Sequence, residues 1–438
     1  MSNKFNTEPT VSVGIMSAIE IRFNFHGAYE ADGALVEGQQ TATVNPDGTV
    51  LWNDSSYGEL LFKATSPKCF FLLEDVTIGV DFHWERKESQ AFRGNLKLLG
   101  GDALTAVNIV PVESYLESVI SSEMSATASD SLLKAHAVIS RSWLLAQIGE
   151  KGERSTEGMT ETEDERIVWY DRDNHERFDV CADDHCQRYQ GITRQTTPAV
   201  AEAVAATRGV VLTDADGNLA DARFSKCCGG VFEEFESCWQ PHHYHYLEAR
   251  SDSDNATEFP DLRGESNARE WILSNPDAFC NVTDKAVLSQ VLNNYDQETP
   301  DFYRWKVVYD KETLSRIVRE RSGIDFGYIT AMEALERGTS GRIIRLRITG
   351  TKRSMVIGKE LEIRRTLSES HLYSSAFVAE MADKDADGVP ATITLYGAGW
   401  GHGVGLCQIG AAAMGAKGYD YKHILRHYFP GADLTTLY

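Results

Sequence analysis

The sequence lacks any long apolar run. No stretch approaches the roughly 20 apolar residues that a helix needs to cross a bilayer, so no transmembrane segment is expected. Residues 1–10 are polar and lack the apolar core of a signal peptide. As written, the chain looks either cytoplasmic or like a mature form from which a leader has been removed.

Basic charge is scarce as well. The chain has 43 Lys and Arg against 65 Asp and Glu, a formal net charge of -22 at pH 7. Nucleic-acid binding requires a basic stripe that neutralises phosphates, and the sequence has none, so no nucleic-acid partner is predicted. A neutral or cationic substrate, such as a sugar polymer, fits this charge without electrostatic conflict.

A regular cysteine framework is also missing. The eight cysteines are spaced too unevenly for a disulfide scaffold in a chain of 438 residues. Four of them fall between Cys181 and Cys228, close to several histidines. This clustering favours a metal site or reduced thiols.

The first pattern along the chain is one of strands. Residues 11–15 and 19–23 alternate apolar and polar side chains, which is typical of half-buried strands. Helical spacing starts after Asn108, where Leu116, Val119 and Ile120 form an apolar stripe that should end near Glu123. Further predictions, in chain order, are a helix at 131–147, a surface loop at 150–173, a hairpin at 210–224, a strand at 305–309 and helices at 312–321 and 421–428.

Three sequence blocks carry a resemblance to a known family. Residues 113–124 end in Glu-Met, and residues 133–141 read Leu-Lys-Ala-His-Ala-Val-Ile-Ser-Arg. Residues 179–189 contain Cys-Gln-Arg-Tyr, and residues 397–411 contain Gly-Trp-Gly-His-Gly-Val-Gly-Leu-Cys-Gln. In this order, the blocks resemble the SpoIID/LytB family, in which Gln usually stands at the position of His136.

The resemblance implies that Glu123 is the general acid/base of a peptidoglycan lytic transglycosylase. Ordinary glycosidases need two carboxyl groups. Here one suffices, because the C6 hydroxyl of the N-acetylmuramic acid residue is the nucleophile and a 1,6-anhydro sugar is the product. The SpoIID branch implies denuded glycan as substrate and an N-acetylmuramoyl-L-alanine amidase as functional partner, whereas the LytB branch implies a non-catalytic glycan-binding or amidase-enhancing module.

A general acid must hold its proton near neutral pH, so the pKa of Glu123 has to rise. The C-terminal end of a helix disfavours the carboxylate by only about 0.3–1 kcal/mol. Met124 and a groove wall would supply the rest by desolvation. The alternative is a solvated carboxylate at a helix end.

Other residues of the three blocks are candidates for substrate positioning. Four residues are expected to position substrate or to orient Glu123, namely Tyr115, Arg141, Tyr189 and Gln408. In the Gly-rich block, Trp400, His402 and Gln408 are expected to line or brace the glycan groove, since indole faces stack on sugar rings. Alternatively, His402 and Gln408 hydrogen-bond tight turns. A phosphate loop is disfavoured, because the Lys-Ser/Thr pair and the strand-loop-helix setting of such a loop are missing.

The segment around residue 180 has the donors of a structural zinc site. It offers two imidazoles and two thiolates within a dozen residues, namely His175, Cys181, His185 and Cys186. Four protein ligands leave no open coordination position, so a catalytic metal is disfavoured. A disulfide or free thiols are the alternatives. A Cys228 nucleophile beside His402 and a Ca²⁺ loop at 383–394 are weaker alternatives.

These observations predict an α+β protein of two lobes with a groove between them. The β-rich N-terminal part is expected at residues 1–100, with the catalytic helices and Cys/His segment at 101–240. Residues 241–390 should form a second lobe, and the Gly-rich block at 391–438 should return to the catalytic core. The substrate places the protein in the cell envelope or periplasm, and the sequence alone leaves the cytoplasm open.

Overall fold

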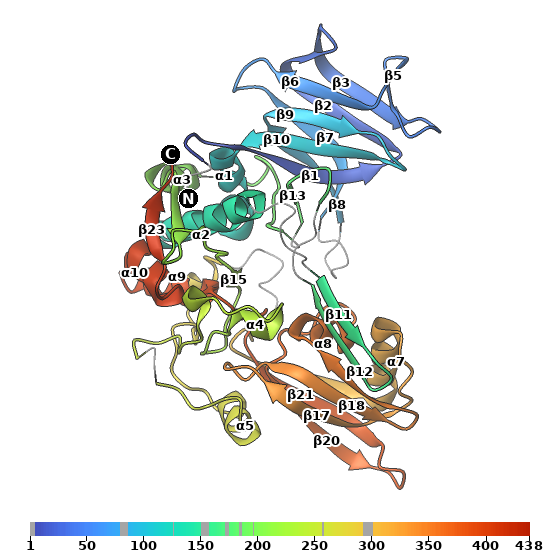
Figure 1. The fold of residues 1–438 in the computed structure, drawn as a ribbon, viewed down its shortest axis with the longest axis vertical. Helices are drawn as coiled ribbons and strands as arrows, with labels where there is room; N and C mark the ends of the chain where they lie inside the picture. The colour runs from blue at the N-terminus through green and yellow to red at the C-terminus, as the bar shows by residue number, and fades with distance from the viewer. Residues whose placement is uncertain are drawn as a thin grey trace.

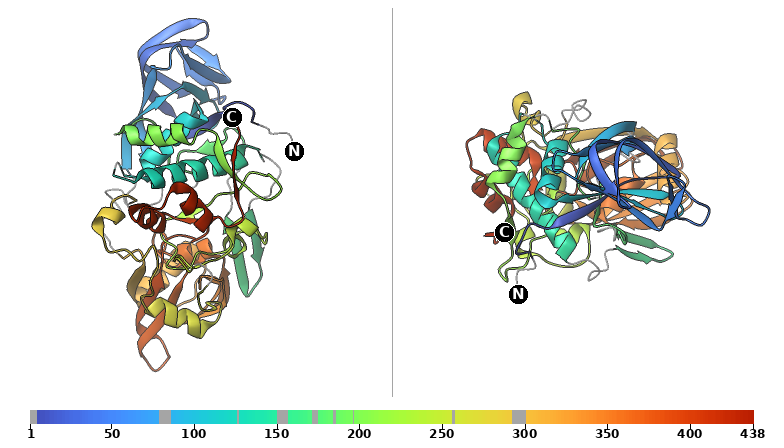
Figure 2. Two further views of the ribbon diagram at one scale, coloured as in Figure 1. Left: turned by 90° about the vertical axis from the view of Figure 1, so that its left-hand side faces the viewer. Right: turned by 90° about the horizontal axis from the view of Figure 1, so that it is seen from above.

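The computed structural model has a strand-rich body at each end and helices between them (Figures 1 and 2). It is a mixed α/β fold. It describes residues 5–78, 86–125, 127–149, 157–170, 175–183, 186–195, 197–255, 258–291 and 301–438. Among these residues, no helix is both long and apolar enough to cross a membrane.

The N-terminal body is an eleven-stranded sheet with the order β13-β1-β10-β9-β6-β2-β3-β4-β5, and β7 pairs with β2 and β8. Side chains of β2 alternate between exposed and buried, as its sequence predicts, and Phe23 and Phe62 pack edge to face in the core. The bounds are β1 Thr10–Ala18, β2 Glu20–Ala31, β3 Ala34–Val44, β4 Val50–Trp52, β5 Ser55–Tyr57, β6 Glu59–Ala64, β7 Phe70–Ile78, β8 Arg86–Arg93, β9 Asn95–Leu99, β10 Leu104–Pro111 and β13 Val180–Cys181.

The middle of the molecule is helical. The apolar stripe of α1 (Val112–Glu123) packs on α2 (Asp130–Gly149), so both predicted helices are confirmed within a few residues. Around α2 lie α3 (Pro198–Ala206), α9 (Gln408–Ala416) and α10 (Tyr421–Tyr428). The C-terminal block therefore returns to the helices that carry Glu123.

The third part of the molecule combines a five-stranded and a three-stranded sheet, with orders β11-β12-β19-β18-β17 and β16-β21-β20. Helix α7 (Lys311–Ser322) and helix α8 (Glu360–Thr366) pack on these strands, and α5 (Glu265–Leu273) packs on β20 and β21. The strands are β11 Glu157–Glu161, β12 Glu165–Tyr170, β16 Arg304–Asp310, β17 Ile329–Arg337, β18 Ile343–Gly350, β19 Ser354–Gly358, β20 Phe377–Lys384 and β21 Pro390–Ala398.

One sequence prediction is wrong. The expected loop at 150–173 contains β11 and β12, and β12 pairs in parallel with β19. Its residues 167–170, Ile-Val-Trp-Tyr, favour a strand despite the acidic flanks. The expected hairpin at 210–224 has its turn and an antiparallel bridge between Thr213 and Leu219, and β14 (Val210–Thr213) also pairs with the C-terminal strand β23 (Asp433–Thr436). The remaining short elements are β15 (Phe224–Ser225), α4 (Phe235–Cys238), a 3-10 turn (His245–Leu247), α6 (Lys285–Leu288) and β22 (Leu406–Cys407).

Candidate functional site

Glu123 is the last residue of α1, and its side chain is half-buried. The helix ends there because Met124 adopts an extended conformation while its N–H still donates to the Ile120 carbonyl, at 2.8 Å. The Met124 side chain is only 3 % exposed, so it anchors the helix end in the core. The carboxyl group consequently lies at the boundary between core and solvent.

The loop after Glu123 is held by a residue that sequence reasoning missed. The Gln290 carbonyl accepts from the Ser125 N–H at 2.9 Å, and its side-chain Oε1 accepts from the Ser129 N–H at 3.0 Å. Gln290 is buried and lies 161 positions from Ser129 in the chain. No local pattern around Glu123 indicates such a distant contact.

Tyr115 of α1 and Tyr189 form a buried aromatic pair. Their rings stack at 5.1 Å, the Tyr115 hydroxyl donates to Gln187 Oε1 at 3.3 Å, and the Tyr189 hydroxyl donates to Asn108 Oδ1 at 2.5 Å. Burial is the main reason that the pKa of Tyr115 lies well above its usual value, with smaller contributions from nearby cysteines, Tyr189 and Glu123. Tyr115 therefore stays a neutral donor to Gln187.

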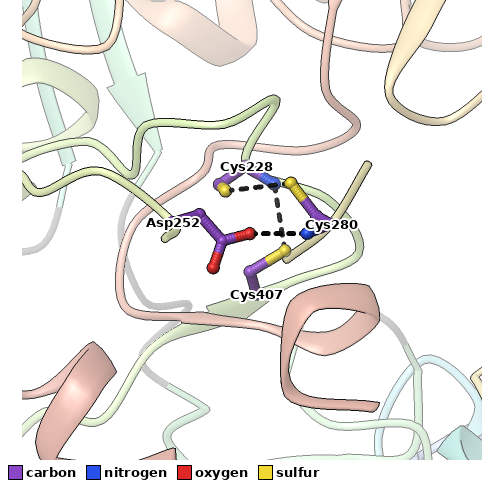
Figure 3. A group of neighbouring side chains, drawn as sticks. All are labelled: Cys228, Asp252, Cys280 and Cys407. Carbon is purple, nitrogen blue, oxygen red and sulfur yellow. Dashed lines mark hydrogen bonds between the residues drawn. The ribbon is translucent and has the colours of Figure 1, made fainter. Parts of the chain in front are cut away.

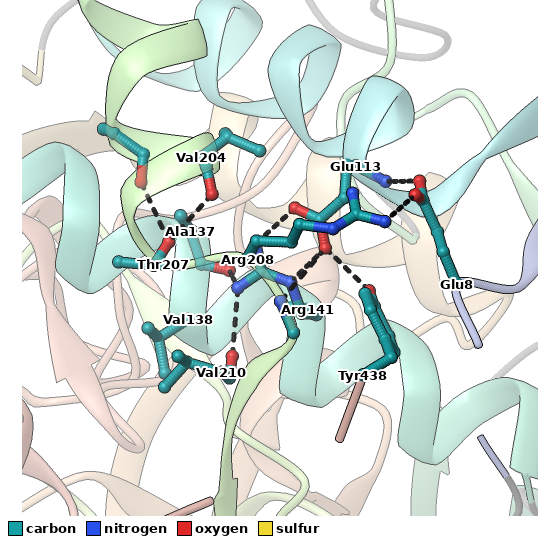
Figure 4. Close-up of polar contacts among 12 residues, drawn as sticks. Glu8, Glu113, Ala137, Val138, Arg141, Val204, Thr207, Arg208, Val210 and Tyr438 are labelled. Carbon is teal, nitrogen blue, oxygen red and sulfur yellow. Dashed lines mark hydrogen bonds and ion pairs between the residues drawn. The ribbon is translucent and has the colours of Figure 1, made fainter. Parts of the chain in front are cut away.

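Arg141 is fully buried and pairs with Glu113 at the opposite end of α1 (Figure 4). Its Nε and one terminal nitrogen donate to the two carboxylate oxygens at 2.9 and 2.6 Å, and another nitrogen donates to the Val210 carbonyl at 3.0 Å. The Tyr438 hydroxyl donates to Glu113 Oε1 at 2.7 Å. Arg141 thus joins α1, α2 and β14, and Tyr438 adds the chain's C-terminal residue through Glu113.

Gln408 links α9 to α2 through His136. Gln408 Nε2 lies 3.3 Å from His136 Nε2, while His136 Nδ1 lies 3.1 Å from the Ser140 hydroxyl. Desolvation, followed by the charge of Lys226, lowers the pKa of His136 to about 3, so the ring is neutral. A neutral ring accepts from Gln408 and donates to Ser140, which satisfies both nitrogens in the core.

Trp400 and His402 are partly buried in the Gly-rich block. The Trp400 ring packs between Phe302 and Tyr373, at 4.7 and 4.5 Å. His402 Nδ1 accepts from the Val404 N–H at 3.0 Å, and burial, helped by nearby arginines, lowers its pKa to about 3. These contacts match the alternative in which His402 braces a tight turn.

The glycines of this block make room for a buried guanidinium. Gly403 has φ +77°, and a Cβ there would lie 2.4 Å from the Arg342 guanidinium. Arg342 is 1 % exposed and donates to the Gly401 carbonyl. The loop therefore wraps around Arg342, which explains the Gly-rich sequence without a phosphate ligand.

The predicted zinc ligands partly converge. The ligand atoms of His175, Cys181 and Cys186 all lie within 4.8 Å of one another, with Cys186 Sγ 3.5 Å from His175 Nε2. β13 carries Cys181 and pairs in parallel with β1, so the N-terminal sheet holds one side of this cluster. His185 lies outside the described residues. One imidazole and two thiols at these separations fit a zinc ion.

The Cys228 thiol does not fit a nucleophile. It is 2 % exposed, and burial raises its pKa well above the usual value for cysteine, so the reactive thiolate is disfavoured. The segment 383–394, considered as a Ca²⁺ loop, contains the end of β20, a turn at residues 385–389 and the start of β21. In the turn, Asp385 Oδ1 accepts from the N–H groups of Asp387 and Val389.

Comparisons with known proteins point to one family. Residues 100–213 match the model described as Stage II sporulation protein, and residues 233–405 match a domain of unknown function. The amidase enhancer of Bacillus subtilis (strain 168) is 26 % identical over 54 % of this chain, which spans only 32 % of that protein. Stage II sporulation protein D of Bacillus amyloliquefaciens is 22 % identical over 75 % of this chain and 76 % of its own length. The resemblance to the SpoIID/LytB family is confirmed.

Proposed function

Because the chain carries a SpoIID-family segment at residues 100–213, we propose that it is a lytic transglycosylase that cleaves peptidoglycan glycan strands. The observation that supports this most directly is the position of Glu123. It ends α1 inside the matched segment, half-buried beside the buried Met124, with the loop after it held by Gln290.

In the proposed reaction, Glu123 acts twice. Its carboxylic acid first protonates the glycosidic oxygen between N-acetylmuramic acid and N-acetylglucosamine. The resulting carboxylate then removes the proton of the muramic C6 hydroxyl, whose oxygen attacks C1 and closes a 1,6-anhydro ring. The proton returns to the enzyme and no water is consumed. Bound glycan would complete the desolvation that a half-buried carboxyl lacks.

Four of the predicted site residues act as positioning residues in this proposal. Tyr115, Arg141, Tyr189 and Gln408 are all at most 2 % exposed, so they reach the glycan only through other residues. They hold α1, α2, α9 and the 187–189 segment together, and thereby set the direction of Glu123. Trp400 and His402, which are partly exposed, are proposed to border a glycan groove between the helices and the second strand-rich body.

We also propose a structural zinc ion at His175, Cys181 and Cys186, with His185 as fourth ligand. Cys186 directly precedes Gln187, which accepts from the Tyr115 hydroxyl, so the metal would fix the segment that carries Gln187 and Tyr189. Metal analysis of the purified chain tests this. Cys181→Ser should bind one zinc fewer per chain than the wild type, whereas Cys69→Ser, at a buried cysteine that directly precedes β7, should bind as much as the wild type. An unchanged zinc content in Cys181→Ser would refute the site.

The catalytic proposal is tested by digestion of denuded glycan followed by mass analysis. The wild type should release 1,6-anhydro products, and Glu123→Gln should lower their rate by at least about 100-fold. Glu117→Gln is the matched control, because Glu117 is a half-buried carboxyl on the same helix. Undiminished product from Glu123→Gln would overturn the mechanism.

A second candidate is a non-catalytic module that enhances an amidase at the cell envelope. The similarity to a protein named amidase enhancer favours it. An N-acetylmuramoyl-L-alanine amidase is assayed on peptidoglycan with the wild type or Glu123→Gln added. Equal stimulation by both, without anhydro products from either, would favour this candidate over the transglycosylase.

A further inference from the structure

A second cysteine cluster lies in the core, away from the His175 segment. It brings together Cys228, which follows β15, Cys280, which precedes α6, and Cys407, which ends β22 (Figure 3). The three sulfurs and a carboxylate oxygen of Asp252 all lie within 4.8 Å of one another, and all four residues are buried. No local sequence pattern indicates this cluster, because its members are spread over about 180 positions.

The spacing of the sulfurs suits a metal ion better than a disulfide. Cys228 Sγ and Cys280 Sγ are 3.5 Å apart. A disulfide requires about 2.05 Å. A tetrahedral zinc ion with Zn–S bonds of about 2.3 Å separates its sulfurs by about 3.8 Å, close to the separation seen here.

The hydrogen-bond donors around the cluster would stabilise a negatively charged sulfur. The N–H groups of Cys228 and Gly410 both point at Cys407 Sγ, at 3.3 and 3.5 Å. Cys407 also caps the N-terminus of α9, whose dipole favours a negative sulfur. Asp252 is oriented by the Cys280 N–H at 2.9 Å and the Tyr428 hydroxyl at 2.7 Å. These donors resemble the outer shell that orients metal ligands.

The cluster also contains a buried carboxylate. Asp252 is 0 % exposed and brings its carboxylate oxygen to the three sulfurs. A divalent ion bound here would release thiol protons to solvent and offset part of the charge of the four ligands.

We propose that Cys228, Asp252, Cys280 and Cys407 bind a single structural zinc ion. Three sulfurs and one oxygen close a tetrahedral shell and leave no open position, so the ion carries no substrate. The Cys227 thiol also contacts Cys280 and Cys407. We assign it outside the shell, and its own variant tests this assignment.

The proposed ion would connect distant parts of the fold near Glu123. Cys280 is joined through α6 to Gln290, which binds the loop after Glu123. Cys407 begins α9, which carries Gln408 to His136 on α2. Metal loss is therefore expected to loosen residues 279–291.

The test is the zinc content per chain of matched variants of the full chain. Cys280→Ser and Cys407→Ser should each bind one zinc fewer than the wild type, whatever the His175 cluster holds. Cys227→Ser and Cys69→Ser should bind as much as the wild type. An unchanged content in Cys280→Ser, or a Cys228–Cys280 disulfide in non-reducing peptide mapping, would overturn the proposal. A loss of zinc in Cys227→Ser would overturn the ligand set.

A second measurement avoids variants of the buried cluster. In Cys181→Ser, which removes a ligand of the other cluster, X-ray absorption at the zinc edge should show a sulfur-dominated shell. Hydrogen exchange of residues 279–291 should accelerate on chelation. Absence of zinc from a folded Cys181→Ser chain, or a shell of nitrogen and oxygen alone, would refute the site.

Discussion

The two ends of α1 each carry a glutamate, and the two are built for different tasks. Glu113 in the first turn is 8 % exposed and is bound by Arg141, Tyr438 and the Gly209 N–H. Glu123 in the last turn is half-buried, with Met124 anchored beside it. The polar bonds at Glu113 tie it to α2, to β23's neighbour Tyr438 and to Gly209, whereas Glu123 is partly exposed to solvent. The two ends of one helix therefore place the same side chain in different surroundings.

The largest expected effect comes from breaking the pair at the buried end. Arg141→Met leaves the Glu113 charge uncompensated and should lower the free energy of unfolding by about 3–5 kcal/mol. Chemical denaturation measures it. The double variant Arg141→Met/Glu113→Leu removes both charges and should recover much of the loss. A single variant as stable as the wild type would show that the pair contributes nothing.

Acid should lower the stability of the protein through His136, which links α2 to α9. Because its folded-state pKa is about 3, below the usual 6.5, its contribution is present above pH 6.5 and is lost as pH falls toward 3. The expected slope is about 1.4 kcal/mol per pH unit in that window. His136→Gln, the residue usual in the family, can still bond to Gln408 and should flatten the slope by that amount. His402 has the same depressed pKa and keeps its own share. An unchanged slope in His136→Gln would contradict this account.

The parts of the fold that the sequence predicted are those encoded locally. The stripe of Leu116, Val119 and Ile120 predicted α1 and its end, because three apolar residues at helical spacing specify one buried face. The His175–Cys186 cluster was predicted for the same reason, since its donors lie within a dozen residues.

The missed features depend on contacts between distant segments. Gln290 binds Ser129, 161 positions away, and Cys280 lies beside Cys228, 52 positions away. Nothing in the sequence next to Gln290 or Cys280 indicates these contacts. β11 was missed because it is an edge strand without an alternation of buried and exposed side chains, and even Met159 is 61 % exposed. The burial of Arg141 was missed because arginine is seldom buried unless paired, and its partner lies on the other helix.

A smaller effect is expected from a variant of Gln290, which holds the loop after Glu123. Gln290→Ala removes the acceptor for the Ser129 N–H and should cost about 1 kcal/mol of stability. Activity on denuded glycan should fall further, up to about tenfold, because the direction of Glu123 loosens. Gln290→Glu keeps an acceptor oxygen and serves as the control. Equal activity of the alanine variant and the wild type would show that Gln290 does not position Glu123.

The smallest expected change in stability comes from Glu123→Gln. The same substitution at Glu113 allows a direct comparison of the two ends of α1. Glu123→Gln should alter the free energy of unfolding by no more than about 0.5 kcal/mol, since an amide replaces a half-buried carboxyl at almost equal volume. A slight gain is consistent with a functional group kept at some cost to stability. Glu113→Gln, the same substitution on the same helix, removes one charge of a buried ion pair and should cost several times more. Denaturation curves of the two variants measure both changes. Equal losses of unfolding free energy would show that Glu123 is a structural residue like Glu113.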